Sequence, residues 1–441
     1  MRIGIVPGLN ASDGGIYQYS VTMLQALEER RSHASGDEFI IFASDMRNPT
    51  LGELTEKGWN IAHLVPPTLK RRSVKLVQRI FGPRPREAMF RLAGRWFHRN
   101  TITPSDLDSV CFNQEMDRWF RRNGIELMLY AISSSLSFET TIPYVMAIHD
   151  LQHRLQPQFP EVSANGEWES REYLFRNGIR NATLLLAESE TGKEDILNFY
   201  GHYRVTPDRI KVLPLLPSSM LADEVSPEEQ HRVRAAYELP ERYMFYPAQF
   251  WPHKNHLRIV EALGSLKKRR GLEIPILFCG FHSGEVREQV FAEVTSRAAK
   301  LGIDKQIKYL GYVPDQDMAA LYKGARALIM PTFFGATNIP PLEAWSLGCP
   351  VLTSDIRGIR QQAGDAAILV DPESIEEIAH GICRLWTDDE LCRELIQKGK
   401  GRTNTFTLRD FRVRLAEIIE EAKSRITSKP ASHKSSKMTD F

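Results

Sequence analysis

Short apolar runs alternate with longer amphipathic segments along most of the chain. The runs 3–6 and 325–330 are apolar throughout, which is typical of strands buried on both faces of a parallel sheet. Further runs of this kind lie at 39–42, 61–65, 125–130, 143–151, 184–188, 210–214, 243–247, 276–279, 307–310, 351–355 and 367–371. Segments between them, such as 16–29 and 408–424, repeat apolar residues at helical spacing. The alternation predicts an α/β protein with doubly wound parallel sheets.

The length of the chain, 441 residues, exceeds what one hydrophobic core usually supports. Residues 215–235 combine prolines, serines and a charged run, as interdomain connections do. We therefore predict an N-terminal domain of residues 1–222 and a C-terminal domain of residues 223–404. A helical segment, 405–426, follows, and the polar tail 427–441 is expected to be disordered.

Composition narrows the class of protein. A hydrophobic content of 42% and a charged content of 25% are those of a soluble globular protein, and no apolar run is long enough to span a bilayer. The chain enters its first strand directly after Met1, without a signal peptide. Its five cysteines lack the spacing of a metal site or a disulfide framework. These features predict a cytoplasmic protein.

The segment 66–122 differs from its surroundings in composition and charge, and we interpret it as an insertion in the N-terminal domain. Between residues 70 and 99 there are ten Lys or Arg residues and one acidic residue, Glu87, with apolar and aromatic residues at helical spacing. Such a basic amphipathic segment favours contact with an anionic membrane surface. A helical pair that covers the domain with a solvated basic face is an equal alternative. Nothing else in the chain supports nucleic-acid binding.

Polar and glycine-containing loops follow several of the predicted strands. Gly14 and Gly15 come between the first strand and a helix, where backbone N–H groups can approach a phosphate or hydroxyl, although an ordinary tight turn is also possible. The loop is not G-x-G-x-x-G, so a nicotinamide cofactor is unsupported. His149 stands at the carboxyl end of a strand, where open α/β sheets bind ligands.

Two loops in the second half offer groups for an anion. Lys254 lies where a loop meets a helix and is a candidate to hold a diphosphate as a point charge. In 330–352, a small-residue loop opens onto a short helix, 341–347, whose N-terminus attracts anions. Glu343 in its first turn either complements the helix dipole or accepts hydroxyl donors from a ribose or sugar.

Taken together, the motifs resemble those of glycosyltransferase family 4, which has the GT-B fold. The motifs occur in the family's order: Gly14-Gly15, His149-Asp150, AESE at 187–190, FYPAQFWPHKNH at 245–256, NIPPLEA at 338–344 and GDAAILVDP at 364–372. The resemblance implies two Rossmann-like domains that face each other across a cleft. It also implies that the C-terminal helix crosses back to the N-terminal domain.

The resemblance also implies a site and a reaction. The family transfers a sugar from a nucleoside diphosphate with retention and without a bound metal, so no cofactor is expected beyond the nucleotide-sugar. The implied catalytic residues are His149, Lys254 and Glu343. The implied donor-binding residues are Gly14, Gly15, Gln249, His253, Lys254, Gly280, Thr337, Asn338, Ile339, Pro340 and Glu343.

The sequences of segments 246–256 and 335–343 are most similar to those of bacterial mannosyltransferases of polysaccharide and O-antigen assembly. This likeness implies GDP-mannose as donor and a glycan or lipid-linked acceptor. A lipid-linked glycan at the inner face of the membrane would suit the basic segment 70–99. Two positions depart from the family. Gly335 stands where the family has its first Glu, and Gln249 stands where it has an Arg.

Two other functions remain open at this point. A sugar-nucleotide epimerase of the same fold would share the nucleotide loops but needs an acid/base pair that the sequence does not place. A non-catalytic scaffold that binds nucleotide or glycan would show the same two departures.

Overall fold

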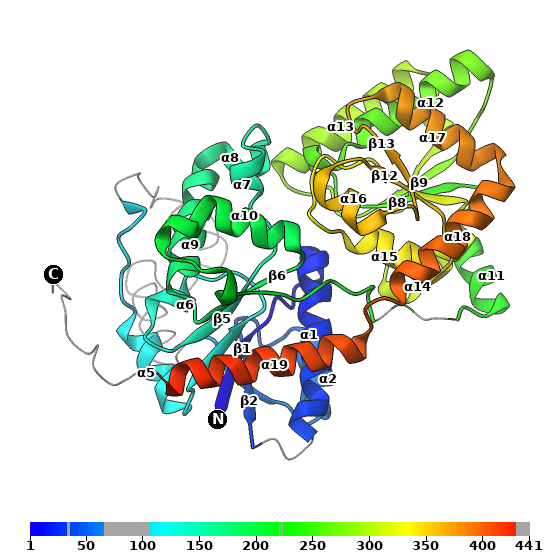
Figure 1. The fold of residues 1–441 in the computed structure, drawn as a ribbon. Helices are drawn as coiled ribbons and strands as arrows, with labels where there is room; N and C mark the ends of the chain where they lie inside the picture. Colours follow the sequence, from blue (N-terminus) through cyan, green and yellow to red (C-terminus); the bar gives the residue numbers. More distant parts are fainter. Residues whose placement is uncertain (33–35, 66–105, 220, 222–223, 429–441) are drawn as a thin grey trace, which may run out of the picture.

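Two α/β domains and a long terminal helix make up the part of the chain that the computed structural model describes, residues 1–32, 36–65, 106–219, 221 and 224–428 (Figure 1). The N-terminal strands are β1 (Arg2–Val6), β2 (Glu38–Ala43), β3 (Asn60–His63), β4 (Leu127–Tyr130), β5 (Tyr144–Ile148), β6 (Leu184–Ala187) and β7 (Ile210–Val212). The main helices are α1 (Gly15–Ser32), α2 (Pro49–Glu56), α5 (Gln114–Arg122), α6 (Leu136–Glu139), α7 (Gln152–Leu155), α8 (Pro160–Ser163), α9 (Glu167–Asn181) and α10 (Glu190–Tyr200).

The C-terminal domain repeats this plan. Its strands are β8 (Met244–Pro247), β9 (Ile276–Cys279), β10 (Ile307–Tyr309), β11 (Ala327–Met330), β12 (Val351–Ser354) and β13 (Ile368–Val370). Its helices are α11 (Pro227–Ala236), α12 (His256–Arg270), α13 (Glu285–Lys300), α14 (Asp315–Gly324), α15 (Ile339–Ser346), α16 (Arg357–Ala363), α17 (Ile375–Thr387) and α18 (Asp389–Thr403). The predicted alternation of strands and helices is confirmed.

The strand order of each sheet places a ligand site at its carboxyl edge. The N-terminal order is β3-β2-β1-β4-β5-β6-β7, the C-terminal order is β10-β9-β8-β11-β12-β13, and the paired strands are parallel. The order reverses between β1 and β4 in one sheet and between β8 and β11 in the other. Such switch points are where open parallel sheets bind ligands. Gly14 follows β1, and Lys254 and the 331–338 loop follow β8 and β11.

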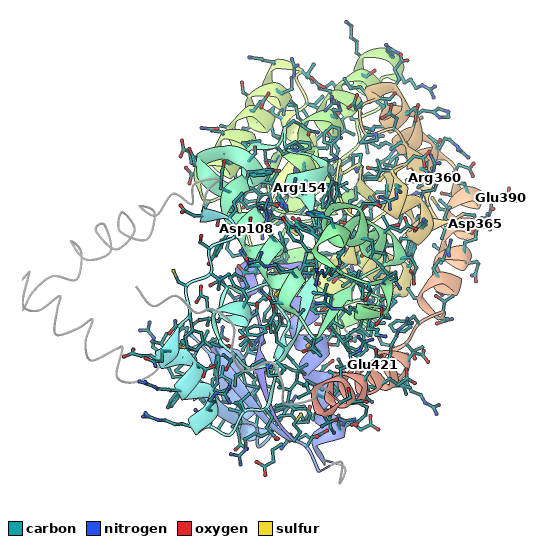
Figure 2. The ribbon with its side chains drawn as sticks, turned by 60° about the vertical axis from the view of Figure 1, so that its left-hand side comes forward. Asp108, Arg154, Arg360, Asp365, Glu390 and Glu421 are labelled. Atoms are coloured by element: carbon teal, nitrogen blue, oxygen red, sulfur yellow. The ribbon has the colours of Figure 1, made fainter. Side chains whose placement is uncertain are left out.

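The last helix, α19 (Leu408–Thr427), returns to the N-terminal domain, as the resemblance implied (Figure 1). A capping box between Thr407 and Asp410 starts it. Its apolar face, with Phe411 and Leu415, enters the same buried cluster as Ile3 of β1. Figure 2 shows the helix from another side, with Glu421 on it and Asp365 and Glu390 in the C-terminal domain. The predicted GT-B arrangement is confirmed.

Polar contacts join the two domains around the space between their facing loops. Arg357 of α16 contacts Asp195 and Glu194 of α10, each at 2.6 Å. A further contact between the domains is the Gln156 side-chain amide, which donates to the carbonyl of Phe333 at 2.8 Å. These contacts hold the carboxyl edges of the two sheets toward each other.

Several expectations fall on residues that the structure does not describe. The basic segment 70–99 lies outside the described residues, as do 429–441 of the tail and residues 222–223 at the expected domain boundary. The membrane contact, the disordered tail and the boundary therefore stay predictions. Of the insertion, the described part 106–122 ends in α5. Within the described chain, no helix combines the length and the apolar character needed to cross a membrane.

Candidate active site

A cavity of about 430 Å³ lies between the two domains, at the carboxyl edges of both sheets. The structure brings together at its wall every residue that the resemblance implied: Gly14, Gly15, His149, Gln249, His253, Lys254, Gly280, Thr337, Asn338, Ile339, Pro340 and Glu343. A single space bounded by both domains is the size and position expected for a small-molecule site. The roles of these residues stay predictions, and their geometry follows.

Lys254 presents a positive charge to the cavity. It ends a short 3₁₀ turn (Pro252–Lys254) after β8, and its side chain is half-buried. Among the described residues no carboxylate lies within ion-pair distance of its ammonium. Burial lowers the pKa of Lys254 to about 8, although Asp150 and Glu161 at longer range favour the charged form. An ammonium without a partner at a cavity wall is ready for an anionic ligand.

His253 ties this loop to the opposite domain. Its Nδ1 lies 2.6 Å from Oε1 of Glu161 on α8. Its carbonyl accepts hydrogen bonds from the backbone of Phe333 and the hydroxyl of Thr332, at 2.8 and 3.0 Å. Burial lowers the pKa of His253 despite the carboxylate of Glu161. The residue therefore holds Lys254 beside the 331–338 loop, and Glu161 is a contact that the sequence gave no reason to expect.

Glu343 is a buried carboxyl group at the cavity wall. The hydroxyl of Tyr322 on α14 donates to its Oε2 at 2.7 Å, and its Oε1 is buried with no hydrogen-bond partner in the described protein. Burial raises the pKa of Glu343 to about 7, and the Tyr322 hydroxyl, together with the Gln18 side chain and the Ser218 backbone near the carboxyl group, offsets only part of this. A buried carboxyl group with an oxygen that lacks a well-oriented donor fits a ligand hydroxyl at this place.

His149 has both ring nitrogens occupied by protein. Its Nε2 faces the carbonyl of Ala131 at 2.8 Å, and its Nδ1 lies 2.6 Å from Oε1 of Glu188. Burial favours the neutral ring, but Glu188 outweighs it and raises the pKa of His149. A direct contact of His149 with the donor sugar would require one of these bonds to be exchanged, so that role stays a prediction.

The loop before α15 supplies fewer backbone donors than the sequence suggested. Pro340 and Pro341 in the first turn have no N–H, and the N–H of Asn338 donates to Oε1 of Gln362 at 3.0 Å. Of the residues at the helix start, Ile339 keeps an N–H for a ligand. The helix dipole still favours an anion. Stabilisation of an anionic ligand at this helix start therefore depends more on the ammonium of Lys254.

A larger residue at Gly335 would be strained in this loop and would displace the Asn338 side chain. Its φ is +143°, and a Cβ would lie 2.2 Å from Nδ2 of Asn338. The absence of the family's first Glu therefore goes with a loop conformation in which the Asn338 side chain fills the space. Gly280, with φ +131° and a Cβ position 2.7 Å from the carbonyl of Ala248, meets the same kind of restriction.

Gln249, which stands where the family has an Arg, is itself contacted by an arginine. Nη1 of Arg287 on α13 donates to its Oε1 at 2.6 Å, and Nε1 of Trp251 donates to the same oxygen at 3.1 Å. The Arg287 guanidinium lies 4.6 Å from the centre of the Trp251 ring. Gln249 thus places a cation from a different helix behind the cavity wall.

The far end of the C-terminal wall is aromatic and acidic. The rings of Phe281 and Tyr312 stack with centroids 5.1 Å apart. Asp315, at the start of α14, lines the same cavity, and burial raises its pKa. No described side chain forms an ion pair with Asp315. A flat aromatic pair beside a carboxylate suits a heterocyclic base that carries N–H groups.

Reasoning from the sequence missed four residues that line the site or contact its wall: Glu188, Asp315, Glu161 and Arg287. Glu188 follows directly after the buried strand β6 and so carried the signal that identified His149. Asp315 starts the helix one loop after β10, which is a weaker signal. Arg287 carried none, because its place depends on how α13 packs. Among the described residues, no three His, Cys, Asp or Glu side chains are grouped to hold a metal ion.

Comparisons with known proteins relate the chain to glycosyltransferases. Residues 228–402 match the family model of "Glycosyl transferases group 1". The O-antigen chain mannosyltransferase B of Escherichia coli is 27% identical over 249 residues, 56% of this chain and 63% of that protein, so the chain spans less than two thirds of this relative. The D-inositol 3-phosphate glycosyltransferase of Corynebacterium glutamicum is 23% identical over 287 residues, 64% of this chain and 67% of that protein.

A crystal structure of Anabaena HepE in complex with UDP and glucose has a similar fold. The TM-score is 0.66 at 14% sequence identity, over 95% of this chain and 99% of that one. At this identity the likeness concerns the fold alone. It extends over both domains and not only over the part that the family model matches.

Proposed function

The chain is a GT-B protein with a group 1 glycosyl transferase domain in residues 228–402, and from this premise we propose that it transfers a sugar from a nucleoside diphosphate to an acceptor hydroxyl. The observation that carries the proposal is Lys254, an ammonium without a described ion-pair partner, in the same cavity as the buried carboxyl group of Glu343. A diphosphate supplies the partner that the ammonium lacks, and a ribose hydroxyl can donate to the carboxyl group.

In this proposal Lys254 and the dipole of α15 receive the charge that develops as the bond between the anomeric carbon and the diphosphate oxygen breaks. Fixed charges of this kind act where charge appears in the transition state. Protein groups can then neutralise the leaving group without a metal, and retention of configuration is part of the same proposal. Transfer in excess EDTA and the anomeric configuration of the product test these two points.

We propose a guanine nucleotide, with mannose as the sugar, as the donor. Asp315 supports the base, because a carboxylate can accept the ring N–H and the exocyclic amino group of guanine together, whereas uracil offers a single N–H. The O-antigen mannosyltransferase among the similar proteins supports the sugar.

Asp315→Asn is expected to raise the Kd for GDP by a factor of about 10 to 100 and to leave the weak binding of UDP unchanged, because a charged hydrogen-bond acceptor is lost. Isothermal titration of both nucleotides measures this, with UDP as the internal control. Equal losses for GDP and UDP would remove the base contact from the proposal.

The N-terminal wall suits an acceptor that offers hydroxyl groups. Asp13, Asp150 and Glu188 line it, and the guanidinium of Arg171 forms an ion pair with Asp150. Carboxylates accept hydrogen bonds from hydroxyls and repel a phosphate. We propose a sugar hydroxyl of a glycan or of a lipid-linked glycan as the acceptor. Contact with the inner membrane surface through 70–99 remains part of the proposal.

A thermal-shift panel of GDP, UDP, dTDP and ADP tests nucleotide binding first. A ligand at 100 times its Kd adds about 2.7 kcal/mol to the free energy of unfolding, so GDP is expected to give the largest shift. Release of free nucleoside diphosphate only when an acceptor is present then distinguishes transfer from epimerisation. Binding of a nucleotide without release under any acceptor would favour the non-catalytic scaffold.

A further inference from the structure

Glu188 joins the two walls of the cavity through a chain of polar contacts. Its Oε1 lies 2.6 Å from Nδ1 of His149 in its own domain, and its Oε2 accepts from the Thr337 hydroxyl in the opposite domain at 3.2 Å. All three residues line the cavity, and the side chains of His149 and Glu188 are 15% and 13% exposed. One carboxylate therefore contacts the 331–338 loop and a candidate catalytic histidine at once.

The contacts of the histidine favour its protonated form. The carbonyl of Ala131 can only accept, so Nε2 of His149 must donate to it. Nδ1 faces the carboxyl group of Glu188, and an ionised carboxylate can only accept, so with Glu188 ionised both nitrogens carry a proton and the ring is an imidazolium. The other titratable groups that face it are Tyr19 of α1, whose ring centroid is 4.9 Å away, and Asp150 beside it. Neither replaces the hydrogen bond of Glu188.

We propose that Glu188 is a positioning residue of the transfer reaction: it holds His149 as an imidazolium on the N-terminal wall and fixes Thr337 of the donor loop against it, so that the two halves of the reacting face assemble together. The inference rests on the proposed function. It goes further in naming the residue that links the charged histidine of the N-terminal wall to the donor loop of the opposite domain. A separation of the domains breaks the Thr337 contact and leaves the His149 contact intact.

The charge on Glu188 is what a glutamine at position 188 cannot supply. A carboxylate has two acceptor oxygens, and each of them has one donor here when the His149 ring is protonated. A glutamine can accept from the Thr337 hydroxyl through its oxygen and donate through its nitrogen to Nδ1, but only if the His149 ring is neutral. Glu188→Gln therefore keeps the shape of the side chain and allows both contacts, but removes the charge that favours the imidazolium.

We expect Glu188→Gln to lower kcat at pH 7.5 at least tenfold and to change its pH dependence. In the wild type Glu188 raises the pKa of His149 against the effect of burial and so extends the imidazolium form to higher pH. Without Glu188 the effect of burial remains, so the pKa falls and the alkaline loss of activity moves to lower pH. The loss relative to wild type is then smaller at pH 6 than at pH 8. A purely structural defect would lower kcat by the same factor at both pH values.

A second readout does not depend on activity. The imidazole of His149, labelled with ¹³C at Cε1 and assigned with His149→Asn, is titrated by NMR in the full chain without substrate. The pKa is expected to fall by more than about 1 unit in Glu188→Gln, as for loss of an adjacent opposite charge. An unchanged pKa overturns the proposal. If the pKa falls but no sugar nucleotide is turned over by the wild type, the failure lies with the proposed function instead.

Two variants serve as controls. Glu194→Gln removes another interdomain carboxylate, the partner of Arg357 at 2.6 Å, and does not touch His149, so its pH profile is expected to match the wild type. Thr337→Val removes only the hydroxyl. It is expected to lower kcat by about tenfold without moving the pH profile. A pH shift in Glu194→Gln, or wild-type kcat in Thr337→Val, would overturn the proposal.

Discussion

Replacing Lys254 with alanine lowers the rate of sugar transfer by a factor of about 10² to 10³, the loss typical of one preorganised group that stabilises transition-state charge. The two prolines at the start of α15 remove backbone donors, and the N–H of Asn338 is held by Gln362. Because few backbone N–H groups of this loop are free, stabilisation of the negative charge on the leaving group depends more strongly on the ammonium of Lys254. Initial rates with GDP-mannose measure the loss.

Burial of the same lysine also makes the affinity for GDP depend on pH. Its pKa is about 8, so the ammonium is charged below this pH and is lost as the pH rises through it. We expect the affinity for GDP to fall between pH 7 and pH 9 in the wild type. In Lys254→Ala this fall is absent, because the titrating group is gone. In Lys254→Arg the affinity, if retained, is flat, because a guanidinium stays charged.

A matched control removes a lysine of the same domain away from the cavity. Lys308 of β10 lies 3.5 Å from Glu238 at the surface, so Lys308→Ala changes the net charge equally without touching the site. Its transfer rate and thermal stability are expected to equal those of the wild type. A Lys254→Ala variant that is folded and transfers sugar at the wild-type rate would contradict the mechanism.

The parts of the site that follow strand ends could be predicted from the sequence. His149 comes directly after a buried apolar run, Gly14 and Lys254 lie in loops that follow such runs, and parallel strands bring their carboxyl ends to one edge. Glu188 carried the same signal as His149, and Asp315 a weaker one as the start of the helix after β10. Both were missed, because polar residues after strands are common and only the cavity shows which ones face it. Arg287 and Glu161 could not be found in this way. They reach the site from helices, and their positions depend on packing between segments far apart in the chain.

The protonation states of the site residues could also not be predicted from the sequence. His149 was expected to face the sugar, whereas the structure gives both of its nitrogens to protein acceptors. Glu343 was expected in the first turn of a helix, where carboxylates are usually solvated and ionised. The fold buries it instead against Tyr322. In both cases the deciding neighbour comes from another element, Glu188 after β6 or Tyr322 on α14.

The burial of Glu343 lowers the stability of the ligand-free protein and at the same time prepares the carboxyl group to bind a ligand hydroxyl. In the unfolded chain a Glu has a pKa of about 4.5, and in the folded protein burial raises it to about 7. Between these two pH values the folded state binds more protons than the unfolded state. The free energy of unfolding therefore falls as the pH rises from about 4.5 to 7, and the full loss persists above pH 7. A ligand hydroxyl that donates to Oε1 would reverse part of this loss.

Glu343→Gln is accordingly expected to make the ligand-free protein more stable and the nucleotide complex weaker. At pH 8 the free energy of unfolding rises by up to about 3 kcal/mol, because one pKa unit corresponds to about 1.36 kcal/mol and the neutral amide is free of this penalty. The Kd for GDP rises by a factor of about 10 to 100, because a charged acceptor for the ribose hydroxyls is lost. Denaturant unfolding and isothermal titration measure the two effects.

The pH of the measurement provides the internal control for this prediction. Near pH 5 the wild-type Glu343 is protonated in the folded state, so the stability advantage of Glu343→Gln is expected to shrink to a small fraction of its value at pH 8. The variant is expected to be more stable but to bind GDP more weakly. General damage to the fold would lower both the stability and the affinity, so it cannot produce this combination. A variant that is less stable than the wild type at pH 8, or that binds GDP equally well, would show that the buried carboxyl group serves the packing of α14 against α15 and not a ligand.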